Sequence, residues 1–571
     1  MESNRIGVYV CWCGTNIAKV VDVEKVAEEV KNLDGVIISK SYHYMCSDPG
    51  QEMILKDIKE YDLKRVVVAA CSPRIHELTF RKALEKAGLN PYMFQMANIR
   101  EQVSWVHAEK DFATQKAIEL VKGAIHRVRL HEPLEKRSVE VDDKTLVVGG
   151  GISGITAALT IADAGKKVYL IEKSNVLGGH VAQIDLLFPS LQHASKMVKA
   201  KIQKLEQHPN IQVFLNTEIE KLTGYIGNFE THLNHGSDRD LKFGNIILAT
   251  GIKPFVPDKL KSYGYGKLSN IITSNEFEKM LLQGKIRTQE GMEPKHIVII
   301  HCVGSRNSKY HEYCSRTCCS TALKYVHQIN SALPQANIYD IYADMRAFGK
   351  GCEELYTSAS KNNVAFLMFD QENDLPQINK AENGEGSILV IKFNEKLSGE
   401  SVKVKADMVI LMVAMEAKDD AKKTSQTFGI SVDKNHFYLE KHPKLDPVAT
   451  TTDGVYVVGG CQSPKGMIES ISQARAASAR VLATIAQKEV EIEVTTSMVT
   501  EEVCCGCQTC ISVCPYSAIS FLEDKNVSFV NEVLCKGCGT CTSACPTGAI
   551  HSKHFSYKQI LSQINGIMST N

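Results

Sequence analysis

The chain has 571 residues, which exceeds what one hydrophobic core supports and predicts three or four domains. Hydrophobic residues make up 44% and charged residues 23% of the sequence, as in ordinary soluble globular proteins. The formal net charge of +1 provides no electrostatic basis for binding nucleic acid. The start lacks the pattern of a secretory signal, and the longest apolar runs are far short of the ~20 residues that span a bilayer. We therefore expect a cytoplasmic protein with no transmembrane segment.

The sequence contains 19 cysteines. Disulfides do not persist in the cytoplasm, so this number favours metal binding or redox catalysis.

Residues 1–138 alternate β-rich runs with helical patterns, which predicts a small parallel α/β domain. The runs are RIGVYVCWCG, GVIISKSYHY and KRVVVAACS, and VDVEKVAEEVKNL has helical spacing. An amphipathic helix is expected over 112–130, ahead of a boundary at Glu132-Pro133. Four cysteines at strand or turn edges are enough for one iron–sulfur cluster, with structural thiols as the alternative: Cys11, Cys13, Cys46 and Cys71.

A dinucleotide-binding pattern follows in LVVGGGISGITAALTIADAGKKVYLIE, residues 146–172. Gly149, Gly151 and Gly154 form G-x-G-x-x-G, which makes a tight turn, lets the backbone approach a pyrophosphate and lets the helix pack on the strand. The pyrophosphate is expected at the helix N-terminus. Glu172 ends the next strand, where a carboxylate can accept hydrogen bonds from ribose hydroxyls. The alternative is a tight strand-to-helix turn without a ligand.

Residues 139–490 carry further strands of a doubly wound architecture, NIILATG, HIVIIHCVG, ADMVILMVA and GVYVVGG. Residues 248–251 and 452–460 resemble motifs of the FAD-containing two-dinucleotide-fold oxidoreductases. Cys461 stands where that superfamily usually has an aspartate for the ribityl chain. The residues predicted to bind FAD are Gly149, Gly151, Ile152, Ser153, Gly154, Glu172, Lys173, Gly179, Ala249, Thr250, Gly251, Gly460, Lys465 and Gly466. Lys465 and Gly466 are expected near the isoalloxazine, with a solvated loop lysine as the alternative.

Members of that superfamily that use NAD(P)H carry a second glycine turn after a later strand. Here the strand at 296–300 runs into HCVGSRNSKYHEYCSRTCCS, so weak or no NAD(P)H binding is expected. The segment KSNVLGGHVAQID after Glu172 also lacks the cysteine pair of a disulfide reductase.

Four cysteines replace the second turn, Cys302, Cys314, Cys318 and Cys319. Four thiolates can hold the corners of a 4Fe-4S cubane, and Arg306, Lys309 and Arg316 could offset their negative charge. A redox-active vicinal disulfide, plain buried thiols and zinc are the alternatives.

After residue 490 two cysteine runs repeat with an offset of 31 residues, in the C-x2-C-x2-C-x3-C-P spacing of a two-cluster ferredoxin. The fourth cysteine of each run ligates the other cluster. One 4Fe-4S cluster is therefore assigned to Cys504, Cys507, Cys510 and Cys545, and the other to Cys514, Cys535, Cys538 and Cys541. Structural zinc is the alternative, and Cys505 is expected to be a bystander.

Together these motifs resemble the HdrA family, the iron-sulfur flavoproteins of heterodisulfide reductases, over nearly the whole chain. GVYVCWCGTNIAKVVDVEKV, VVVAACSPRIHELTFRKAL and GLNPYMFQMANIREQVSWVH are similar to that family's N-terminal domain. The family also supports a 4Fe-4S cluster at the Cys, Cys, Cys-Cys pattern of residues 302–319. Many methanogen members insert a further two-cluster ferredoxin after a stretch similar to GNFETHL at 227–233, whereas this sequence continues without cysteine.

The predicted fold is a doubly wound α/β FAD/NAD-linked reductase core of the thioredoxin-reductase type at 139–490. A small N-terminal α/β domain at 1–138 precedes it, and an α+β two-cluster ferredoxin domain at 491–571 follows.

The resemblance implies an oxidoreductase subunit in which FAD exchanges electrons between a donor module and 4Fe-4S chains by electron bifurcation towards a disulfide and ferredoxin. Disulfide cleavage would belong to another subunit, so no catalytic residue is assigned. Expected partners are heterodisulfide-reductase-type catalytic and cluster subunits, ferredoxin, and a hydrogenase, formate dehydrogenase or NADH-oxidising module, with a homodimer inside a larger complex as one arrangement. A non-bifurcating conduit and assembly subunit is the alternative, and an NAD(P)H-dependent disulfide reductase is a weaker one.

Overall fold

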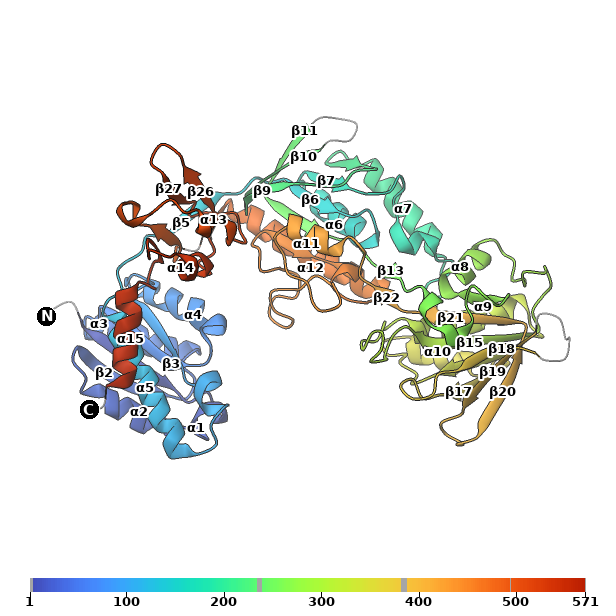
Figure 1. Cartoon of the computed structure of the whole chain (residues 1–571), viewed down its shortest axis with the longest axis horizontal. Coiled ribbons are helices and arrows are strands. Elements are labelled where there is room, and N and C mark those ends of the chain that lie inside the picture. The colour runs from blue at the N-terminus through green and yellow to red at the C-terminus, as the bar shows by residue number, and fades with distance from the viewer. Residues whose placement is uncertain (1–3, 234–238, 382–387, 493, 570–571) are drawn as a thin grey trace. The chain divides into compact units, whose positions relative to one another are not determined.

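The computed structural model describes residues 4–233, 239–381, 388–492 and 494–569. The chain forms two compact units, which are coloured by residue number in Figure 1. Residues 1–138 and 491–571 make up the first unit, and residues 139–490 make up the second. The N-terminal and ferredoxin regions, which differ completely in sequence pattern, thus belong to one unit.

The N-terminal region of the first unit is a parallel four-stranded sheet of order β2-β1-β3-β4. The strands are β1 (Ile6–Cys11), β2 (Val36–Tyr42), β3 (Arg65–Ala70) and β4 (Phe94–Asn98). One face packs on α2 (Val23–Lys31) and α5 (Lys110–Val128), and the other on α3 (Asp48–Glu60) and α4 (Pro73–Lys86). Short helices α1 (Thr15–Ala18) and η1 (Arg100–Ser104) follow β1 and β4. The predicted parallel α/β region is confirmed.

The ferredoxin region of the same unit is built from two antiparallel strand pairs and two short helices. The pairs are β25 (Ser497–Val499) with β28 (Ile550–Ser552) and β26 (Ile519–Leu522) with β27 (Val527–Val530). The helices α13 (Thr509–Ser512) and α14 (Thr540–Ala544) each lie inside one cysteine run, and η6 (Glu501–Val503) precedes the first.

The last helix, α15 (Tyr557–Met568), attaches the ferredoxin region to the N-terminal region by packing along α5. Glycines allow a close approach, since a Cβ on Gly123 would lie 2.7 Å from Ile567 and one on Gly566 would lie 2.8 Å from His126. The strands β5 (Arg137–Glu140) and β24 (Glu489–Ile492) pair where the chain passes between the units.

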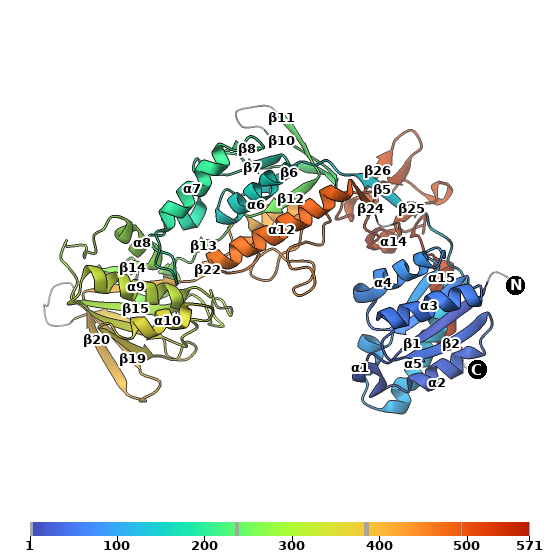
Figure 2. The same ribbon diagram turned by 180° about the vertical axis from the view of Figure 1, so that it is seen from behind.

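The second unit begins with a parallel five-stranded sheet of order β23-β12-β6-β7-β8. Its strands are β6 (Thr145–Val148), β7 (Val168–Ile171), β8 (Ile211–Phe214), β12 (Asn245–Leu248) and β23 (Val455–Val457). The helices α6 (Ile152–Asp163) and α12 (Met467–Gln487) lie side by side on one face, with α7 (Ala194–Glu206) beside α6 (Figure 2). The other face is covered by α11 (Ala421–Thr427) and a meander of β9 (Leu222–Tyr225), β10 (Asn228–Leu233) and β11 (Arg239–Phe243).

A second parallel sheet of order β14-β21-β15-β16-β17 completes this unit. Its strands are β14 (Ile271–Thr273), β15 (His296–Val303), β16 (Asn337–Tyr342), β17 (Val364–Met368) and β21 (Met408–Val413). One face carries α8 (Ser274–Leu282), α9 (Cys318–Ala332) and α10 (Cys352–Ala359), and the other carries β18 (Gln377–Lys380), β19 (Leu389–Asn394) and β20 (Ser401–Ala406).

The strands β13 (Lys253–Pro254) and β22 (Met415–Glu416) pair where the chain passes between the two sheets. Single-turn helices occur at η2 (Gly179–Gln183), η3 (Pro257–Lys259), η4 (Lys261–Tyr263) and η5 (Gly459–Cys461). The predicted doubly wound core is therefore present. Among the residues described, we find no helix with both the length and the apolar character needed to cross a bilayer.

Candidate cofactor sites

The glycine turn between β6 and α6 has the backbone that its motif predicts. Gly149 has φ +109°, and a Cβ there would overlap the carbonyl of Ala249. A Cβ on Gly154 would overlap the Gly149 carbonyl, so α6 can pack here only with glycine. Gly151 differs, because its φ is −78° and no atom of the chain lies within 4 Å of a Cβ built on it. Its lack of a side chain is therefore not needed for packing within the chain.

The acidic residue predicted to bind the ribose, Glu172, lies beside this turn. Glu172 accepts hydrogen bonds from the backbone N–H groups of Gly150, at 2.6 Å, and Ser174, at 2.8 Å. A Cβ on Gly179 would lie 3.0 Å from the Cα of Gly151, so the predicted Gly179 also borders the turn. Lys173 instead pairs with acidic side chains at the surface. Two further predicted residues, Ile152 and Ser153, are buried in the first turn of α6.

The remaining predicted FAD residues follow β12 and β23. Gly251 has φ +79° with open space around it, and Thr250 donates a hydrogen bond to the Tyr438 hydroxyl at 3.4 Å. Ala249 is buried, and a Cβ on Gly460 would lie 2.7 Å from Ile252.

Cys461 cannot act as the carboxylate that it replaces. Its buried thiol donates to the carbonyls of Leu248, at 3.4 Å, and Val458, at 3.2 Å. Burial raises the pKa of this thiol, so it remains neutral.

The side chain of Lys465 folds back onto the loop before α12. Its ammonium group donates to the carbonyl of Gly459 at 2.9 Å, Gln462 Oε1 at 2.6 Å and Ser463 Oγ at 3.1 Å. Burial lowers its pKa to about 8. Gly466 then begins α12 and donates its N–H to Glu469 Oε2 at 3.1 Å.

The four predicted thiols of the second sheet lie together at one end of β15. Cys302 is the penultimate residue of this strand and has φ +57°, and Cys318 and Cys319 begin α9. Burial raises the pKa of Cys302 to about 12, and Cys314 and Cys319 are near enough to add to the increase. The Arg306 guanidinium approaches the Cys302 sulfur at 4.0 Å. The structure therefore gathers thiols that are irregularly spaced in sequence.

A buried charged pair beside these thiols was not predicted from the sequence. His301 and Asp340 have exposed fractions of 0%, and Nε2 of the histidine lies 2.6 Å from Oδ1 of the aspartate. Burial alone would lower the pKa of His301. The opposite effects of Asp340 and the Cys319 thiol are larger, so the pKa is raised to about 10. The only sequence signal was a histidine directly before Cys302. Buried Cys352, which accepts a hydrogen bond from Ser320 Oγ at 3.9 Å, was also missed.

The N-terminal thiols come from three neighbouring strand ends. Cys11 ends β1, and Cys13, Cys46 and Cys71 lie in the loops after β1, β2 and β3. Cys13 N–H donates to the Cys11 sulfur at 3.3 Å, and the Arg100 guanidinium donates to the Cys13 sulfur at 3.5 Å. Burial raises the pKa of Cys71 to about 11, with further effects from the guanidinium and the neighbouring thiols. Convergence of these thiols, which sequence spacing cannot indicate, is thus observed.

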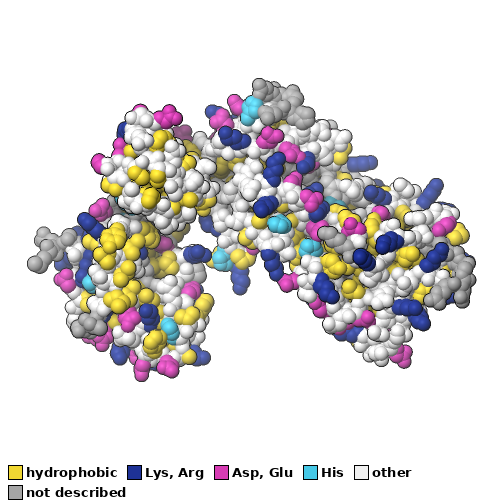
Figure 3. Space-filling model, viewed as in Figure 1, with side chains coloured by type: hydrophobic (Ala, Val, Ile, Leu, Met, Phe, Trp, Pro, Cys, Tyr) yellow, Lys and Arg dark blue, Asp and Glu magenta, His cyan; other side chains and the backbone are white. Residues whose placement is uncertain are grey.

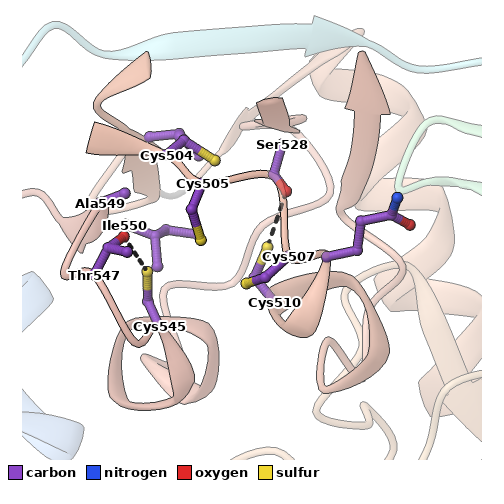
Figure 4. Close-up of a pocket in the computed structure, with 11 residues that line it drawn as sticks. Cys504, Cys505, Cys507, Cys510, Ser528, Cys545, Thr547, Ala549 and Ile550 are labelled. Atoms are coloured by element: carbon purple, nitrogen blue, oxygen red, sulfur yellow. Dashed lines mark hydrogen bonds between the residues drawn. The ribbon is translucent and has the colours of Figure 1, made fainter. Parts of the chain in front are cut away.

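The ferredoxin region contains two small cavities that divide its cysteines. One is lined by Cys504, Cys505, Cys507, Cys510 and Cys545, so a cysteine of the second run joins three of the first (Figure 4). The other is lined by Cys514, Cys535, Cys538 and Cys541. Hydroxyl groups border the sulfurs, with Cys510 donating to Ser528 Oγ at 3.2 Å. This division is the one that the assigned ligand sets require, with Cys505 as an additional exposed thiol.

In the described part of the chain, no three His, Cys, Asp or Glu side chains are grouped so as to hold a metal ion. Around zinc each thiolate sulfur lies about 2.3 Å from one ion. A cubane of four irons is wider, so spread-out thiols around a cavity fit it better than they fit zinc.

Comparison with known proteins matches the reductase core and the ferredoxin region of the chain separately. The family described as pyridine nucleotide-disulphide oxidoreductase matches residues 143–300, and a 4Fe-4S dicluster domain matches residues 491–553. An iron-sulfur subunit of the CoB--CoM heterodisulfide reductase of Methanopyrus kandleri is 40% identical, with 99% of each chain covered. This chain belongs to the HdrA family of heterodisulfide reductases.

Other members of the HdrA family match over similar lengths. The corresponding protein of the H(2):CoB-CoM heterodisulfide,ferredoxin reductase of Methanothermobacter thermautotrophicus is 38% identical, covering 100% of this chain and 98% of that protein. That of the H(2)/formate:CoB-CoM heterodisulfide,ferredoxin reductase of Methanococcus maripaludis is 35% identical, covering 100% and 99%. The chain is thus an oxidoreductase subunit.

The alignment with the Methanopyrus kandleri protein extends over 652 positions, although this chain has 571 residues, so the relative carries segments that have no counterpart here. The expected point of departure follows residues 227–233, which include β10. Residues 234–238, directly after it, lie outside the described residues.

Proposed function

We propose that this chain is the flavin-carrying electron-transfer subunit of a heterodisulfide-reductase-type complex. The observation that carries the proposal is the contrast between the two sheets of the second unit. The first sheet ends in a dinucleotide turn at Gly149, whereas the second ends in the thiols around Cys302. A nucleotide and a cluster, rather than two nucleotides, then share one unit.

The residues of the first sheet fit FAD. The turn from Gly149 to Gly154 would hold the pyrophosphate at the N-terminus of α6, and Glu172 would meet ribose hydroxyls. Lys465 and Gly466 would approach the isoalloxazine. When bound, FAD can accept two electrons and release them singly, which suits a junction between two-electron donors and one-electron clusters. The chain's part is to fix the position of the cofactor.

Four 4Fe-4S clusters are proposed. Two are held by the ferredoxin sets, Cys504, Cys507, Cys510 and Cys545, and Cys514, Cys535, Cys538 and Cys541. A third is held by Cys302, Cys314, Cys318 and Cys319, and a fourth by Cys11, Cys13, Cys46 and Cys71. The support is the gathering of each thiol set, with Arg306 or Arg100 beside the latter two to offset the charge of thiolate ligation.

Electrons are proposed to enter from a partner protein rather than from NAD(P)H. The pyridine nucleotide-disulphide oxidoreductase match ends at residue 300, directly before the thiol-bearing segment. Partners of the hydrogenase, formate dehydrogenase or NADH-oxidising type can supply electron pairs, as the names of relatives that include H(2) and formate suggest. Catalytic and cluster subunits would complete the complex, because no disulfide-cleaving residue is proposed on this chain.

An exposed apolar surface on the first unit is consistent with binding to other subunits of a complex. Apolar side chains along α15 have exposed fractions above 40%, and hydrophobic atoms gather on the surface of the first unit that includes this helix (Figure 3). They belong to Tyr557, Ile560, Leu561, Ile564 and Met568. Such a patch is typical of a surface that contacts another protein.

The finer proposal is electron bifurcation. In this proposal the donor would supply two electron pairs, and FAD held by the turn from Gly149 to Gly154 would supply the chemistry that divides them between two acceptors. One pair, with two protons, would reduce a disulfide to two thiols, and the other two electrons would reduce two one-electron ferredoxins. In the alternative, a non-bifurcating conduit, ferredoxin and disulfide would be reduced independently.

An assay of the anaerobically purified complex separates these functions. Bifurcation predicts that ferredoxin is reduced only while the disulfide is also present, with two ferredoxins reduced for each disulfide. Equal ferredoxin reduction without the disulfide would contradict it and favour the conduit. Turnover of NAD(P)H and a disulfide by this chain alone would instead revive the disulfide-reductase alternative.

A further inference from the structure

The buried pair His301–Asp340 lies on the face of the second sheet that α9 covers. His301 and Asp340 come from adjacent strands, where Ile299 of β15 is the register partner of Asp340 on β16. Ile297, Ile299 and Ile338 on the same strands belong to the apolar core beneath α9. A histidine and a carboxylate thus occupy an otherwise apolar layer, with exposed fractions of 0%.

Stability does not explain this placement. Removing two charges from water costs several kcal/mol per ion, and apolar replacements of buried ion pairs are often neutral or stabilising. The oxygens of Asp340 and both ring nitrogens of His301 also lack hydrogen bonds of good geometry, even though the two groups approach to 2.6 Å. A buried donor without an acceptor needs a separate explanation.

The neighbour of the imidazole supplies that explanation. The Cys319 thiol, one of the four thiols at the end of β15, is near enough to the His301 ring to raise the pKa of the imidazole, although burial lowers that pKa. Cys319 lies in the first turn of α9, where its thiol also approaches the Asp344 carbonyl at 3.6 Å. A thiolate at this position would be the acceptor that the buried imidazole lacks.

We propose that His301, oriented by Asp340, donates a hydrogen bond to the Cys319 thiolate and thereby raises the midpoint potential of the cluster in the second unit. This inference rests on the proposed third cluster. Hydrogen bonds to the sulfurs are among the features that set the potential of such clusters, because they stabilise the additional negative charge of the reduced state. His301 is a tuning residue, since it touches a ligand and not the iron.

The test uses the full chain in its complex and replaces the whole pair. The variant H301L/D340L leaves no unpaired buried charge, so it is expected to fold. The matched control K324L/E278L removes another buried ion pair, formed by Lys324 of α9 with Glu278 of α8. Both variants lose two buried charges that contact α9, but only the first loses the contact with Cys319.

Potentiometric titration followed by electron paramagnetic resonance measures the outcome, with iron per chain as a second readout. At a fixed potential we expect the reduced-to-oxidised ratio of this cluster to fall about tenfold in H301L/D340L, which is about 59 mV for one electron. The control and the ferredoxin clusters should not shift. The iron content should equal that of the wild type.

The tuning role would be overturned by an unchanged potential in H301L/D340L or by an equal shift in the control. It would also be overturned if H301L/D340L alone lost the iron of this cluster, because the pair would then serve to hold the ligand segment in place. Unchanged iron per chain in both C302S and C319S would refute the proposed third cluster itself, before any variant of the pair is compared.

Discussion

The ferredoxin thiols and the thiols of the second sheet, each proposed to hold clusters, lie in different surroundings. The ferredoxin thiols come from a repeated spacing, and Cys507 and Cys538 are exposed beside hydroxyl groups. Of the thiols at the end of β15, Cys302, Cys318 and Cys319 are buried, and charged side chains lie next to them. The comparison teaches that a repeated spacing marks the ferredoxin thiols in the sequence, whereas the fold around each set of thiols determines its electrostatic environment.

That difference has a physical basis. A cluster near the surface is surrounded by water, which screens its charge whatever the sequence nearby. In a buried site each charged neighbour acts at low dielectric, so a pair such as His301–Asp340 has a much larger effect. The second-sheet thiols are therefore where substitutions outside the ligand set should change electron transfer most.

The largest expected effect separates flavin binding from the cluster sites. In G154A the new Cβ meets the Gly149 carbonyl, so the turn should open and no FAD should co-purify, while the iron of the ferredoxin region is kept. G151A is the matched variant, because its Cβ meets no atom of the chain. It should fold but still bind FAD at least tenfold more weakly, because the methyl group would stand where the pyrophosphate approaches. Normal FAD affinity in G151A, measured by fluorescence titration, would refute the assigned phosphate position.

The next effect tests ligation by the repeated spacing. C514S should lose the cluster that Cys514 shares with Cys535, Cys538 and Cys541, which is about four irons per chain. C505S is the matched control and should lose none, because Cys505 is an additional thiol in the first cavity. Iron and acid-labile sulfide assays distinguish them. Equal iron content in the two variants would contradict the crossed ligand sets.

A third prediction concerns buried charge in the second unit. Lys324 pairs with Glu278 and donates to the Leu186 carbonyl at 3.1 Å, almost fully buried. K324M would leave the Glu278 carboxylate unpaired, and we expect a loss of about 3–5 kcal/mol in the free energy of unfolding of this unit. Denaturant unfolding measures it, with exposed K441M as the control. A loss below about 1 kcal/mol would show that the pair is not effectively buried.

The smallest effect is a pH dependence at Lys465. Its pKa of about 8 in the folded chain lies below the ordinary lysine value of about 10.4. Between these values the unfolded chain binds more protons, so stability rises with pH across this window, by on the order of 2 kcal/mol. The Tm of wild type relative to K465M should therefore increase as the pH rises from the folded to the unfolded value. A constant difference would indicate that Lys465 keeps its proton.

Much of the fold followed from local patterns. The glycine turn, α6 and the strand ending at Glu172 were predictable because strand, turn and helix each have their own residue signal. The His301–Asp340 pair was not, because it depends on the register between β15 and β16, which are separated in sequence by α9 and carry no shared motif. The N-terminal thiols likewise come together only because the ends of β1, β2 and β3 lie side by side.

The central claim, one flavin with clusters in both units, is tested most directly by iron, acid-labile sulfide and FAD per chain after purification without oxygen. Four clusters predict about 16 irons and one FAD. A value of about 12 irons would show that the N-terminal cluster is absent, provided that the C71S variant contains as much iron as the wild type. About 8 irons, or full iron without FAD, would contradict the account, because the second unit would then lack either its cluster or its flavin.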